Sequence, residues 1–349
     1  MTLDNLRVGL AFDDVLLVPR RSNIRSRQDV SLRTQLSRRV TLETPVVAAN
    51  MDTVCETAMA AELARAGGIG MLHRFLPIAS QAAMVAEVKA LGRLVGAAVG
   101  TSEDSIERAR ALVEAGADAL VLDIAHGHAD HAIEELIKLK RTFGKDVDII
   151  AGNVATRRGA EDLISAGADA IKVGVGPGGV CTTRLVAGVG VPQLTAINDC
   201  AGLGIPIIAD GGIRRSGDIA KALAAGASSV MIGSLFAGTD ESPGELEQSS
   251  RGLVKTIRGM ASFEAVQARA ERAGESIDVE YFEQRAAEGV SGSVPYRGKV
   301  GKLVGTLMGG VRSAMSYCDA RSIEELWEKA EFVRVTSAGL TESHPHATF

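Results

Sequence analysis

A short pattern that recurs four times along the chain constrains its fold more than any other feature. Each copy begins with Ala-Gly, continues with one or two small or acidic residues, and ends in a run of apolar residues. The residues before each copy have apolar positions three and four apart, which is the spacing of an amphipathic helix. Glycine is favoured just after a helix, and an apolar run without polar alternation is typical of a buried parallel strand. The copies lie at 66–68, 115–118, 166–169 and 225–228.

Further apolar runs bring the number of predicted strands to eight, in strict alternation with helical patterns. This alternation predicts an α/β protein of the (β/α)8 TIM barrel type, whose active site lies at the C-terminal ends of the strands. A doubly wound open sheet is the alternative, but no GxGxxG motif follows the first strand. The predicted strands are 45–49, 69–72, 94–99, 119–122, 147–151, 170–173, 206–209 and 229–232.

Composition excludes several classes of protein. The net charge is −5 and no basic stripe occurs, so nucleic acid is not expected as a partner. The chain has no long apolar run, and it begins with acidic residues where a signal peptide is basic, so neither a membrane span nor secretion is expected. The four cysteines are scattered without CxxC or histidine spacing, which favours a reduced, cytoplasmic protein over a disulfide framework or a zinc site.

A glycine-rich loop follows the predicted strand at 170–173 and presents one thiol, Cys181. Glycines at 174, 176, 178 and 179 allow the backbone to adopt positive φ or to approach a ligand closely. Thr182, Thr183 and Arg184 follow directly, so a thiolate at Cys181 would have two hydroxyls and a cation nearby. Cys181 is therefore a candidate nucleophile, and a purely structural glycine-rich turn is the alternative.

Polar residues and glycines also follow other predicted strands. Asp210 before two glycines would suit a ribose diol, with an Asx-type turn as the alternative. Glycines after the seventh and eighth strands suit a phosphate, which barrels bind through backbone amides. His126 and His128 flank a glycine, but without a third ligand a loop role is favoured over a metal site. The strand-end residues are Asn50, Met51, Asp52, Asp123, Asn153, Asp210, Gly211, Gly212, Gly233 and Ser234.

Taken in order, the motifs of the chain resemble the inosine-5′-monophosphate (IMP) dehydrogenase / guanosine-5′-monophosphate (GMP) reductase family over nearly the whole length. The resemblance implies an oxidoreductase acting at C2 of a purine nucleotide. The matching segments are FDDVLLVP (12–19), NMDTV (50–54), AGNV (151–154), GVGPGGVCTTR (174–184), GVGVPQ (188–193), ADGGIR (209–214), RGM (258–260), GGVRSAM (309–315) and SAGLTESHPH (337–346).

The resemblance implies a role for each matching residue. Cys181 would attack C2 of the purine and form a covalent adduct, while Thr183 and Glu288 would handle protons beside the base. Glycines and polar side chains at the strand ends would hold ribose and phosphate, and Gly259 and Met260 would line the base. The substrate-binding residues implied are Met51, Asp210, Gly211, Gly212, Gly233, Ser234, Gly259 and Met260.

The resemblance also implies cofactors and a partner subunit. Asp123 and Asn153 would face a nicotinamide cofactor, NADPH in the reductase branch or NAD in the dehydrogenase branch. Three backbone carbonyls of the cysteine loop resemble a monovalent-cation site, with K⁺ as the expected ion. The tail of a neighbouring subunit would complete it, so a homotetramer or an octamer is expected. The cation-site residues are Gly176, Gly178 and Cys181, joined by Glu342, Ser343 and His344 of the neighbour.

The resemblance further implies a single catalytic barrel domain over 1–349. A mobile flap is expected after the eighth strand, at approximately 261–298, and a C-terminal tail at 335–349. The paired regulatory (CBS) module usual in dehydrogenases is absent, since the chain runs straight from the second predicted strand to the third.

The flap sequence favours the reductase branch. Dehydrogenases carry an Arg-Tyr pair there that activates water, but Glu280 precedes Tyr281 in this chain, and a carboxylate cannot act as a cationic donor. Arg272 or Arg285 would fill that role only if the alignment slips. Asn50 also matches the reductase form of its motif. The segments that favour IMP dehydrogenase instead are AHGH (125–128), AGVGVPQ (187–193), the flap length and the SAGLTESHPH tail.

Two departures from the family pattern concern the nucleotide. Gly179 stands where the family usually carries a phosphate-binding serine, and Ile257 stands where dehydrogenases carry a tyrosine. Each loses one hydrogen bond, worth ~1 kcal/mol, so backbone amides compensate or the purine is a modified one. A catalytically silent nucleotide-binding relative is a further alternative, against which the retention of Cys181, Thr183 and Glu288 argues.

Overall fold

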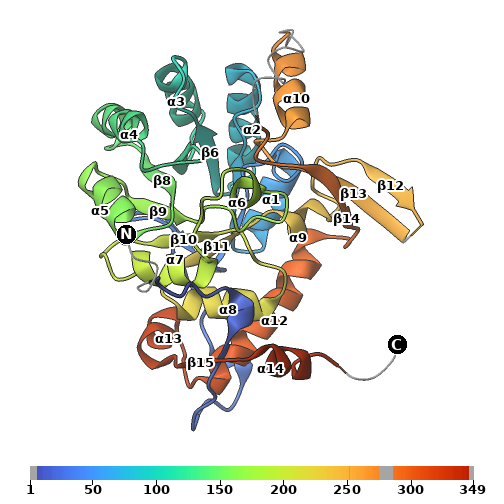
Figure 1. Ribbon diagram of the computed structural model, residues 1–349. Helices are drawn as coiled ribbons and strands as arrows, with labels where there is room; N and C mark the ends of the chain where they lie inside the picture. The colour runs from blue at the N-terminus through green and yellow to red at the C-terminus, as the bar shows by residue number, and fades with distance from the viewer. Residues whose placement is uncertain (1–5, 251, 275–285, 346–349) are drawn as a thin grey trace.

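The computed structural model describes residues 6–250, 252–274 and 286–345, and within these ranges eight parallel strands form a closed barrel (Figure 1). The strands follow one another around the barrel in the order β10-β11-β4-β5-β6-β7-β8-β9. The barrel confirms the predicted TIM fold, and every predicted strand is present with shifts of at most three residues at its ends. The strands are β4 (Val46–Ala48), β5 (Ile69–Leu72), β6 (Val95–Val99), β7 (Ala119–Asp123), β8 (Asp148–Val154), β9 (Ala170–Val173), β10 (Ile207–Asp210) and β11 (Ser229–Ile232).

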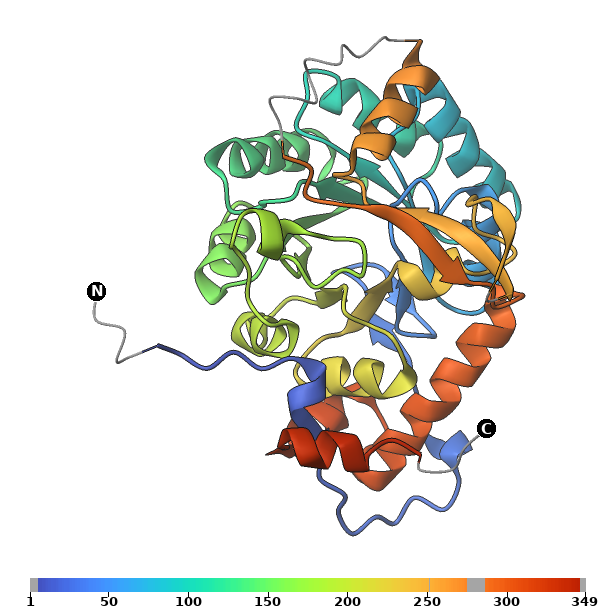
Figure 2. The same ribbon diagram turned by 45° about the vertical axis from the view of Figure 1, so that its right-hand side comes forward.

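Helices surround the barrel on its outside (Figures 1 and 2). The last of the ring, α12, packs against both α8 and α1 and so closes the circle. The outer helices are α1 (Thr57–Arg65), α2 (Ile78–Ala90), α3 (Ser105–Glu114), α4 (Asp130–Phe143), α5 (Arg157–Ser165), α7 (Gln193–Cys200), α8 (Ser216–Ala224) and α12 (Val300–Tyr317).

The recurring Ala-Gly pattern ends a helix and starts a strand in all four copies. Its glycines adopt φ values between 88° and 110°, in the left-handed region where a side chain is strained. In two copies the acidic residue then binds the start of the preceding strand. Asp118 accepts a hydrogen bond from Val95 N, and Asp169 accepts one from Ile149 N, both at 2.8 Å. The pattern therefore sets both the helix end and the strand register.

A hairpin closes the barrel at the end opposite the strand C-termini. It consists of β2 (Thr34–Gln35) and β3 (Thr41–Leu42), and it places the fully buried Leu36 against the barrel interior. Ser37 Oγ and Arg39 N each donate to Asp148, the first residue of β8, at 2.7 Å. The hairpin thus fills this end of the barrel interior, and the largest group of predicted site residues lies at the opposite end, where the strands finish.

The remaining elements are short and lie outside the barrel strands and the ring of helices. Between the barrel and α12, the described residues form a small antiparallel sheet and the helix α10 (Figure 2). Glu280, Tyr281 and Arg285 of the expected flap lie outside the described residues. Within the described ranges, no helix is long and apolar enough to span a membrane. These elements are η2 (Phe12–Asp14), β1 (Val15–Leu17), η3 (Arg27–Asp29), α6 (Thr183–Val186), α9 (Ser234–Ala237), β12 (Leu246–Ser249), β13 (Gly252–Arg258), α10 (Phe263–Ala273), β14 (Ser291–Pro295), α13 (Ile323–Lys329), β15 (Phe332–Arg334) and α14 (Ser337–Glu342).

Candidate active site

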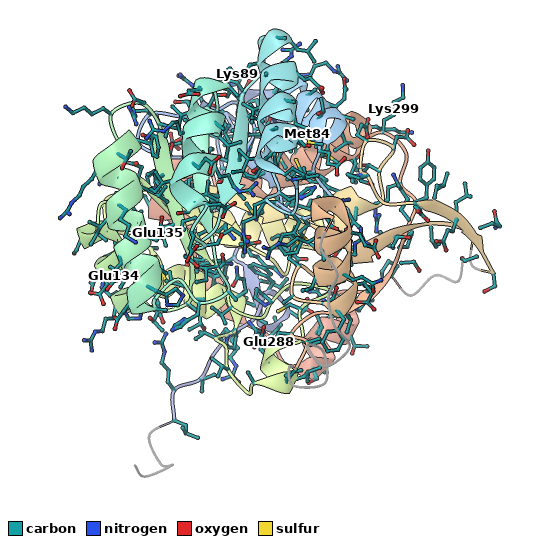
Figure 3. All side chains as sticks on the ribbon, turned by 90° about the horizontal axis from the view of Figure 1, so that it is seen from above. Met84, Lys89, Glu134, Glu135, Glu288 and Lys299 are labelled. Carbon is teal, nitrogen blue, oxygen red and sulfur yellow. The ribbon has the colours of Figure 1, made fainter. Side chains whose placement is uncertain are left out.

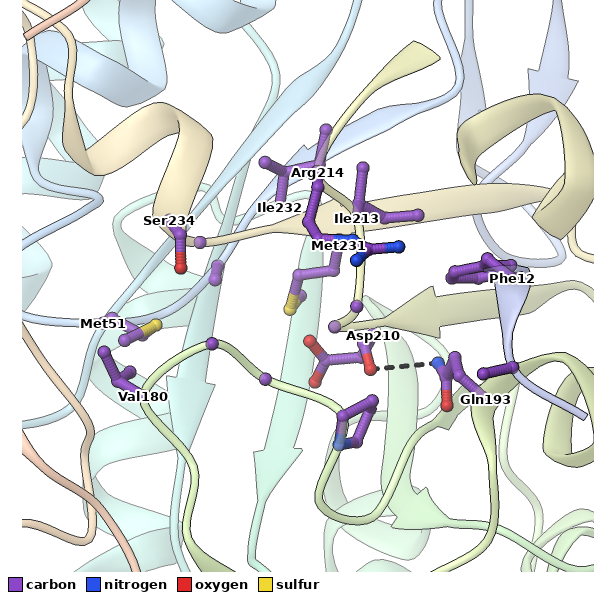
Figure 4. Close-up of a pocket in the computed structure, with 18 of the residues that line it drawn as sticks. Phe12, Met51, Val180, Gln193, Asp210, Ile213, Arg214, Met231, Ile232 and Ser234 are labelled. Atoms are coloured by element: carbon purple, nitrogen blue, oxygen red, sulfur yellow. Dashed lines mark hydrogen bonds between the residues drawn. The ribbon is translucent and has the colours of Figure 1, made fainter. Parts of the chain in front are cut away.

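Two cavities meet at the C-terminal ends of the barrel strands and share part of their lining, including Met51 and Asp210. The first has a volume of about 430 Å³ and is shown in Figure 4; the second has about 420 Å³. Of the residues predicted from sequence, the first cavity brings together Gly211, Gly212, Gly233 and Ser234. The second brings together Asp123, Asn153, Gly176, Cys181, Thr183, Gly259, Met260 and Glu288, and Gly178 lines both.

Cys181 lies in the loop after β9, with its thiol beside a hydroxyl. Its Sγ is 3.2 Å from Thr183 Oγ1, and its backbone N–H donates to Gly178 O at 3.1 Å. Gly176 has a φ of 84°, and a Cβ there would lie 2.5 Å from Arg184 Cγ, so this turn requires glycine. The loop therefore presents a half-buried thiol in a fixed position next to a proton donor and acceptor.

Glu288 reaches the same cavity because its segment pairs with the cysteine loop. Thr182 N donates to Glu288 O at 2.9 Å, and Val290 N donates to Val180 O at 3.0 Å. Cys181 itself forms an antiparallel bridge with Gly289. Glu288 consequently lines the cavity that holds the Cys181 thiol, near the open end of the barrel (Figure 3).

Arg184 has different partners from those that the sequence suggests. Its guanidinium donates to two backbone carbonyls, Val175 O at 3.2 Å and Val191 O at 2.6 Å. Burial lowers the pKa of this guanidinium, although the charge of Cys181 opposes the shift. Arg184 thus ties the two ends of the loop together, and its charge still interacts with that of Cys181.

A buried lysine that sequence reasoning missed holds Asp210 in place. Lys172 Nζ donates to Asp210 Oδ2 at 2.7 Å and also to Asn153 Oδ1. Asn153 Nδ2 in turn donates to Asp210 Oδ2 at 2.9 Å and to Gly174 O at 2.8 Å. The available signal was a single charged residue inside the otherwise apolar strand AIKV. Asp210 is therefore a fixed hydrogen-bond acceptor at the junction of the two cavities.

Gln193 extends this network into the first cavity. Its Nε2 donates to Val173 O at 2.9 Å and to Asp210 O at 3.0 Å, the latter drawn as a dashed line in Figure 4. Its Oε1 is buried and has no hydrogen-bond partner among the described residues. A buried acceptor without a partner is costly, so a ligand hydroxyl or amide would be stabilised there.

Asp123 faces the second cavity but is already paired. Arg74 Nε donates to Asp123 Oδ2 at 3.1 Å, and the Arg74 guanidinium lies 5.4 Å from the centre of the Phe75 ring. Arg74 is a second residue that sequence reasoning missed, because nothing in the sequence shows which carboxylate it meets.

A protein-family model described as IMP dehydrogenase / GMP reductase domain matches residues 9–346 of the chain. The chain belongs to this family. It is therefore a purine-nucleotide oxidoreductase of a family that uses nicotinamide cofactors, as the sequence motifs indicate. Its barrel is the family's fold.

Similar proteins divide between the two branches of the IMP dehydrogenase / GMP reductase family. The IMP dehydrogenase of Cryptosporidium parvum is 44% identical, over 99% of this chain and 97% of that protein. The GMP reductase of Leishmania major is 38% identical, over 99% and 98%. A crystal structure of a GMP reductase variant from Trypanosoma brucei in complex with guanosine 5′-monophosphate superposes with a TM-score of 0.92, at 38% identity and 99% coverage of both chains.

The two departures from the family pattern have different structural settings. A Cβ at Gly179 would lie 2.8 Å from Ser234 Oγ, so the Ser234 hydroxyl borders the space that a serine at 179 would need. Ile257 is 1% exposed within β13 and belongs to the hydrophobic core, and it is not among the described residues that line either cavity. Neither position supplies a side-chain donor to the first cavity.

Arg272, one candidate for the missing flap arginine, is engaged elsewhere. Its Nη1 donates to Phe75 O at 3.3 Å, and its guanidinium lies 3.9 Å from both Asp52 Oδ2 and Glu56 Oε1. Burial raises the pKa of Glu56, but the hydrogen bond and charge of His73 and the charge of Arg272 lower it overall. Arg272 therefore anchors α10 to the barrel and is not among the described residues that line the second cavity.

The predicted tail residues lie apart from the cysteine loop of their own chain. Glu342 ends α14, and Ser343 and His344 follow it, all three exposed. In Figure 1, α14 lies at the edge of the molecule next to β15, whereas α6 after the cysteine loop lies over the barrel. Within the described ranges no three His, Cys, Asp or Glu side chains converge as metal ligands, and His128 Nε2 pairs with Asp162 Oδ2 at 2.7 Å. A role of the tail at a neighbour's cation site stays a prediction.

Proposed function

We propose that this family member is a GMP reductase, which converts GMP and NADPH into IMP, ammonia and NADP⁺. The proposal rests on the finding that the cations in the cavity around Cys181 are each paired with a carboxylate. Among the described residues, Arg74 and Lys172 are the cations that line the second cavity, and each is bound to a carboxylate. Hydrolysis of a cysteine adduct needs an activated water, and no described cation there is free to assist one. Glu280 stands where dehydrogenases carry their arginine.

The residues around the thiol suffice for expulsion of ammonia. The Cys181 thiolate attacks C2 of the guanine, and the C2 amine leaves as ammonia after accepting a proton. Thr183 Oγ1, 3.2 Å from Sγ, and Glu288 on the same wall supply that proton. Hydride addition at C2 then releases the thiolate, so the sulfur ends as it began and the purine is reduced to hypoxanthine.

The described residues fit both ligands of this reaction. Asp210, fixed by Lys172, accepts hydrogen bonds from the ribose, and the backbone of Gly212 and of Gly233 faces the phosphate. In the second cavity NADPH supplies the hydride when bound. Asp123 and Asn153 would hold it, and the faces of Phe75 and Met260 offer apolar contact for its ring.

The carbonyl groups of the cysteine loop fit a monovalent cation. Gly178 O accepts one hydrogen bond from Cys181 N and keeps a second lone pair. With Gly176 O and Cys181 O it would offer the neutral oxygen ligands that K⁺ prefers. We also propose that residues 1–349 act as one catalytic domain, assembled as a homotetramer or an octamer.

IMP dehydrogenase is the second candidate, because the Cryptosporidium parvum relative carries that name. The same Cys181, Thr183 and Glu288 would form the adduct from IMP and NAD. The hydrolytic step would then depend on a residue outside the described ranges. A reductase for a modified purine nucleotide is the third candidate, prompted by the missing donors at Gly179 and Ile257.

Steady-state turnover of GMP with NADPH, followed by ammonia release, tests the proposal. The wild-type protein should release one ammonia for each NADPH oxidised. The Cys181→Ala variant should keep GMP binding but lose turnover to below a few per cent. A protein that binds GMP but releases no ammonia would contradict the proposal.

A further inference from the structure

One wall of the first cavity is formed by η2, which is held in place by two arginines that precede α8 and by a lysine in the last turn of that helix. Asp13 Oδ1 accepts hydrogen bonds from Arg214 Nη2 at 2.7 Å and from Arg215 Nη2 at 2.9 Å. Lys221 Nζ donates to Phe12 O at 2.8 Å. The N-terminal turn is thereby fixed over the glycines that follow β10.

The two arginines share one carboxylate oxygen but differ in position. Arg214 lines the first cavity together with Gly212 and Ser234, and in Figure 4 its guanidinium points toward the turn that carries Phe12. Arg215 is absent from the described lining of both cavities. The two side chains are similarly exposed, at 56% and 50%. Only Arg214 therefore shares a cavity with the backbone that would face a phosphate.

The cluster carries an excess of positive charge. A second carboxylate, Asp218, is 1% exposed and lies 3.6 Å from Arg214 Nε and 3.7 Å from Arg215 Nε. Burial raises the pKa of Asp13, but the hydrogen bond and charge of Arg214 outweigh this and lower the pKa overall. Among the described side chains of the cluster, three basic residues thus face two acidic ones, and the imbalance lies beside the first cavity.

We propose that Arg214 recognises the 5′-phosphate of the nucleotide, and that Asp13 holds it ready in the absence of that phosphate. A planar guanidinium has five N–H donors, so it is able to bind a phosphate oxygen while keeping contact with Asp13. Gly179 and Ile257 supply no hydroxyl to this end of the cavity, so Arg214 would add, beside the Ser234 hydroxyl, the charged side chain that selects a nucleoside monophosphate over the nucleoside. This inference rests on the proposal that the cavity holds a purine nucleotide, but it does not depend on the direction of the reaction.

Calorimetric titration of IMP and of inosine, without cofactor, tests the inference on matched variants. Arg214→Gln should weaken IMP binding about tenfold, as expected for loss of one charge-assisted hydrogen bond, and leave inosine binding unchanged. Arg215→Gln removes the neighbouring partner of the same Asp13 oxygen and should change either affinity by about twofold at most. Arg214→Lys keeps the charge and should retain part of the IMP affinity. Thermal melting of each variant shows that it is folded.

Two results would overturn the inference. Equal losses in Arg214→Gln and Arg215→Gln would mean that Arg214 acts only by fixing η2. An equal loss for IMP and inosine would mean that it does not recognise the phosphate. If Arg214→Gln does not fold, the Arg214→Lys and Asp13→Asn variants decide. Each should retain only part of the wild-type preference for IMP over inosine, because the first loses the planar guanidinium and the second loses the carboxylate that positions it. An undiminished preference in both variants would count against the inference. Failure of the proposed reaction is a separate outcome. If the protein binds IMP through Arg214 but releases no ammonia from GMP, phosphate recognition by Arg214 stands and GMP reductase activity is excluded.

Discussion

Lys172 donates a hydrogen bond to Asp210 across 2.7 Å, from a side chain that is only 4% exposed. The two residues stand on neighbouring barrel strands, β9 and β10, which run parallel in register. The buried lysine is retained because the Asp210 carboxylate and the Asn153 amide oxygen both accept hydrogen bonds from its Nζ. The pair fixes the acceptor that we assign to the ribose.

Removing this lysine should destabilise the barrel. Lys172→Ala leaves Asp210 as a partly buried carboxylate without its cation, and the free energy of unfolding should fall by about 3 kcal/mol. Urea denaturation followed by circular dichroism measures the change. Arg157→Ala is the control, because its partner Glu161 and itself are about half exposed, and it should cost ~1 kcal/mol or less. Similar losses of unfolding free energy in the two variants would show that the buried pair stabilises the fold no more than an exposed ion pair does.

The two adjacent threonines should differ in their effect on turnover. Thr183 Oγ1 contacts the Cys181 thiol at 3.2 Å, whereas Thr182 Oγ1 donates to Ala287 O at 3.4 Å. Thr183→Val should lower kcat by about 100-fold, the usual cost of losing a proton-transfer group, and Thr182→Val should change it by a few fold. Initial rates at saturating nucleotide measure both. If the two variants lose activity equally, Thr183 is not a proton-transfer group.

The barrel could be predicted from the sequence because the signals that specify its helices and strands are local in the chain. The glycine of each Ala-Gly copy ends a helix through its own backbone conformation, and the apolar run after it is buried whichever neighbours it meets. The alternation of strands and helices along the chain is itself enough to indicate a parallel barrel, without knowledge of contacts between distant residues. Strand ends such as Asp210 then converge by topology, so the glycines at 211 and 212 could be placed correctly.

The side-chain pairs of the site could be predicted only in part. Cys181 and Thr183 are two residues apart, so their contact follows from sequence, but the partners of Lys172, Arg74 and Arg214 are distant in the chain. The carbonyl partners of Arg184 could not be predicted for the same reason, since they depend on how the loop closes. Long side chains choose among many acceptors, and only the folded backbone determines which one is within reach.

Cys181 should be the one thiol of the folded protein that reacts quickly. All four cysteines lie in the described ranges, and Cys181 alone is not buried. Burial raises the pKa of Cys55 and Cys318, and it raises the pKa of Cys200 to about 12, so these three stay as unreactive thiols at neutral pH. Mass spectrometry after brief iodoacetamide treatment should find Cys181 labelled, with protection by GMP. Labelling of Cys55 at the same rate would contradict this account.

The tail should act between subunits. If Glu342, Ser343 and His344 complete a neighbour's cation site, sedimentation should show a tetramer or an octamer, and K⁺ should raise the rate above that in Na⁺. Glu342→Ala should remove the preference for K⁺ while leaving the assembly intact. A stable, active monomer, or equal rates in the two ions, would exclude this arrangement.

The central claim is that the chain forms the C2 adduct but has no efficient means of hydrolysing it. Counting the hydrides transferred per active site, by absorbance of the reduced nicotinamide, tests it most directly. With GMP and NADPH the signal should fall steadily through many turnovers. With IMP and NAD⁺ the signal should rise by at most one equivalent per site and then stop. The reason is that loss of one catalytic base lowers the rate of adduct hydrolysis by roughly 100- to 10,000-fold. Sustained NADH formation with accumulation of xanthosine monophosphate would contradict the account and assign the chain to the dehydrogenase branch.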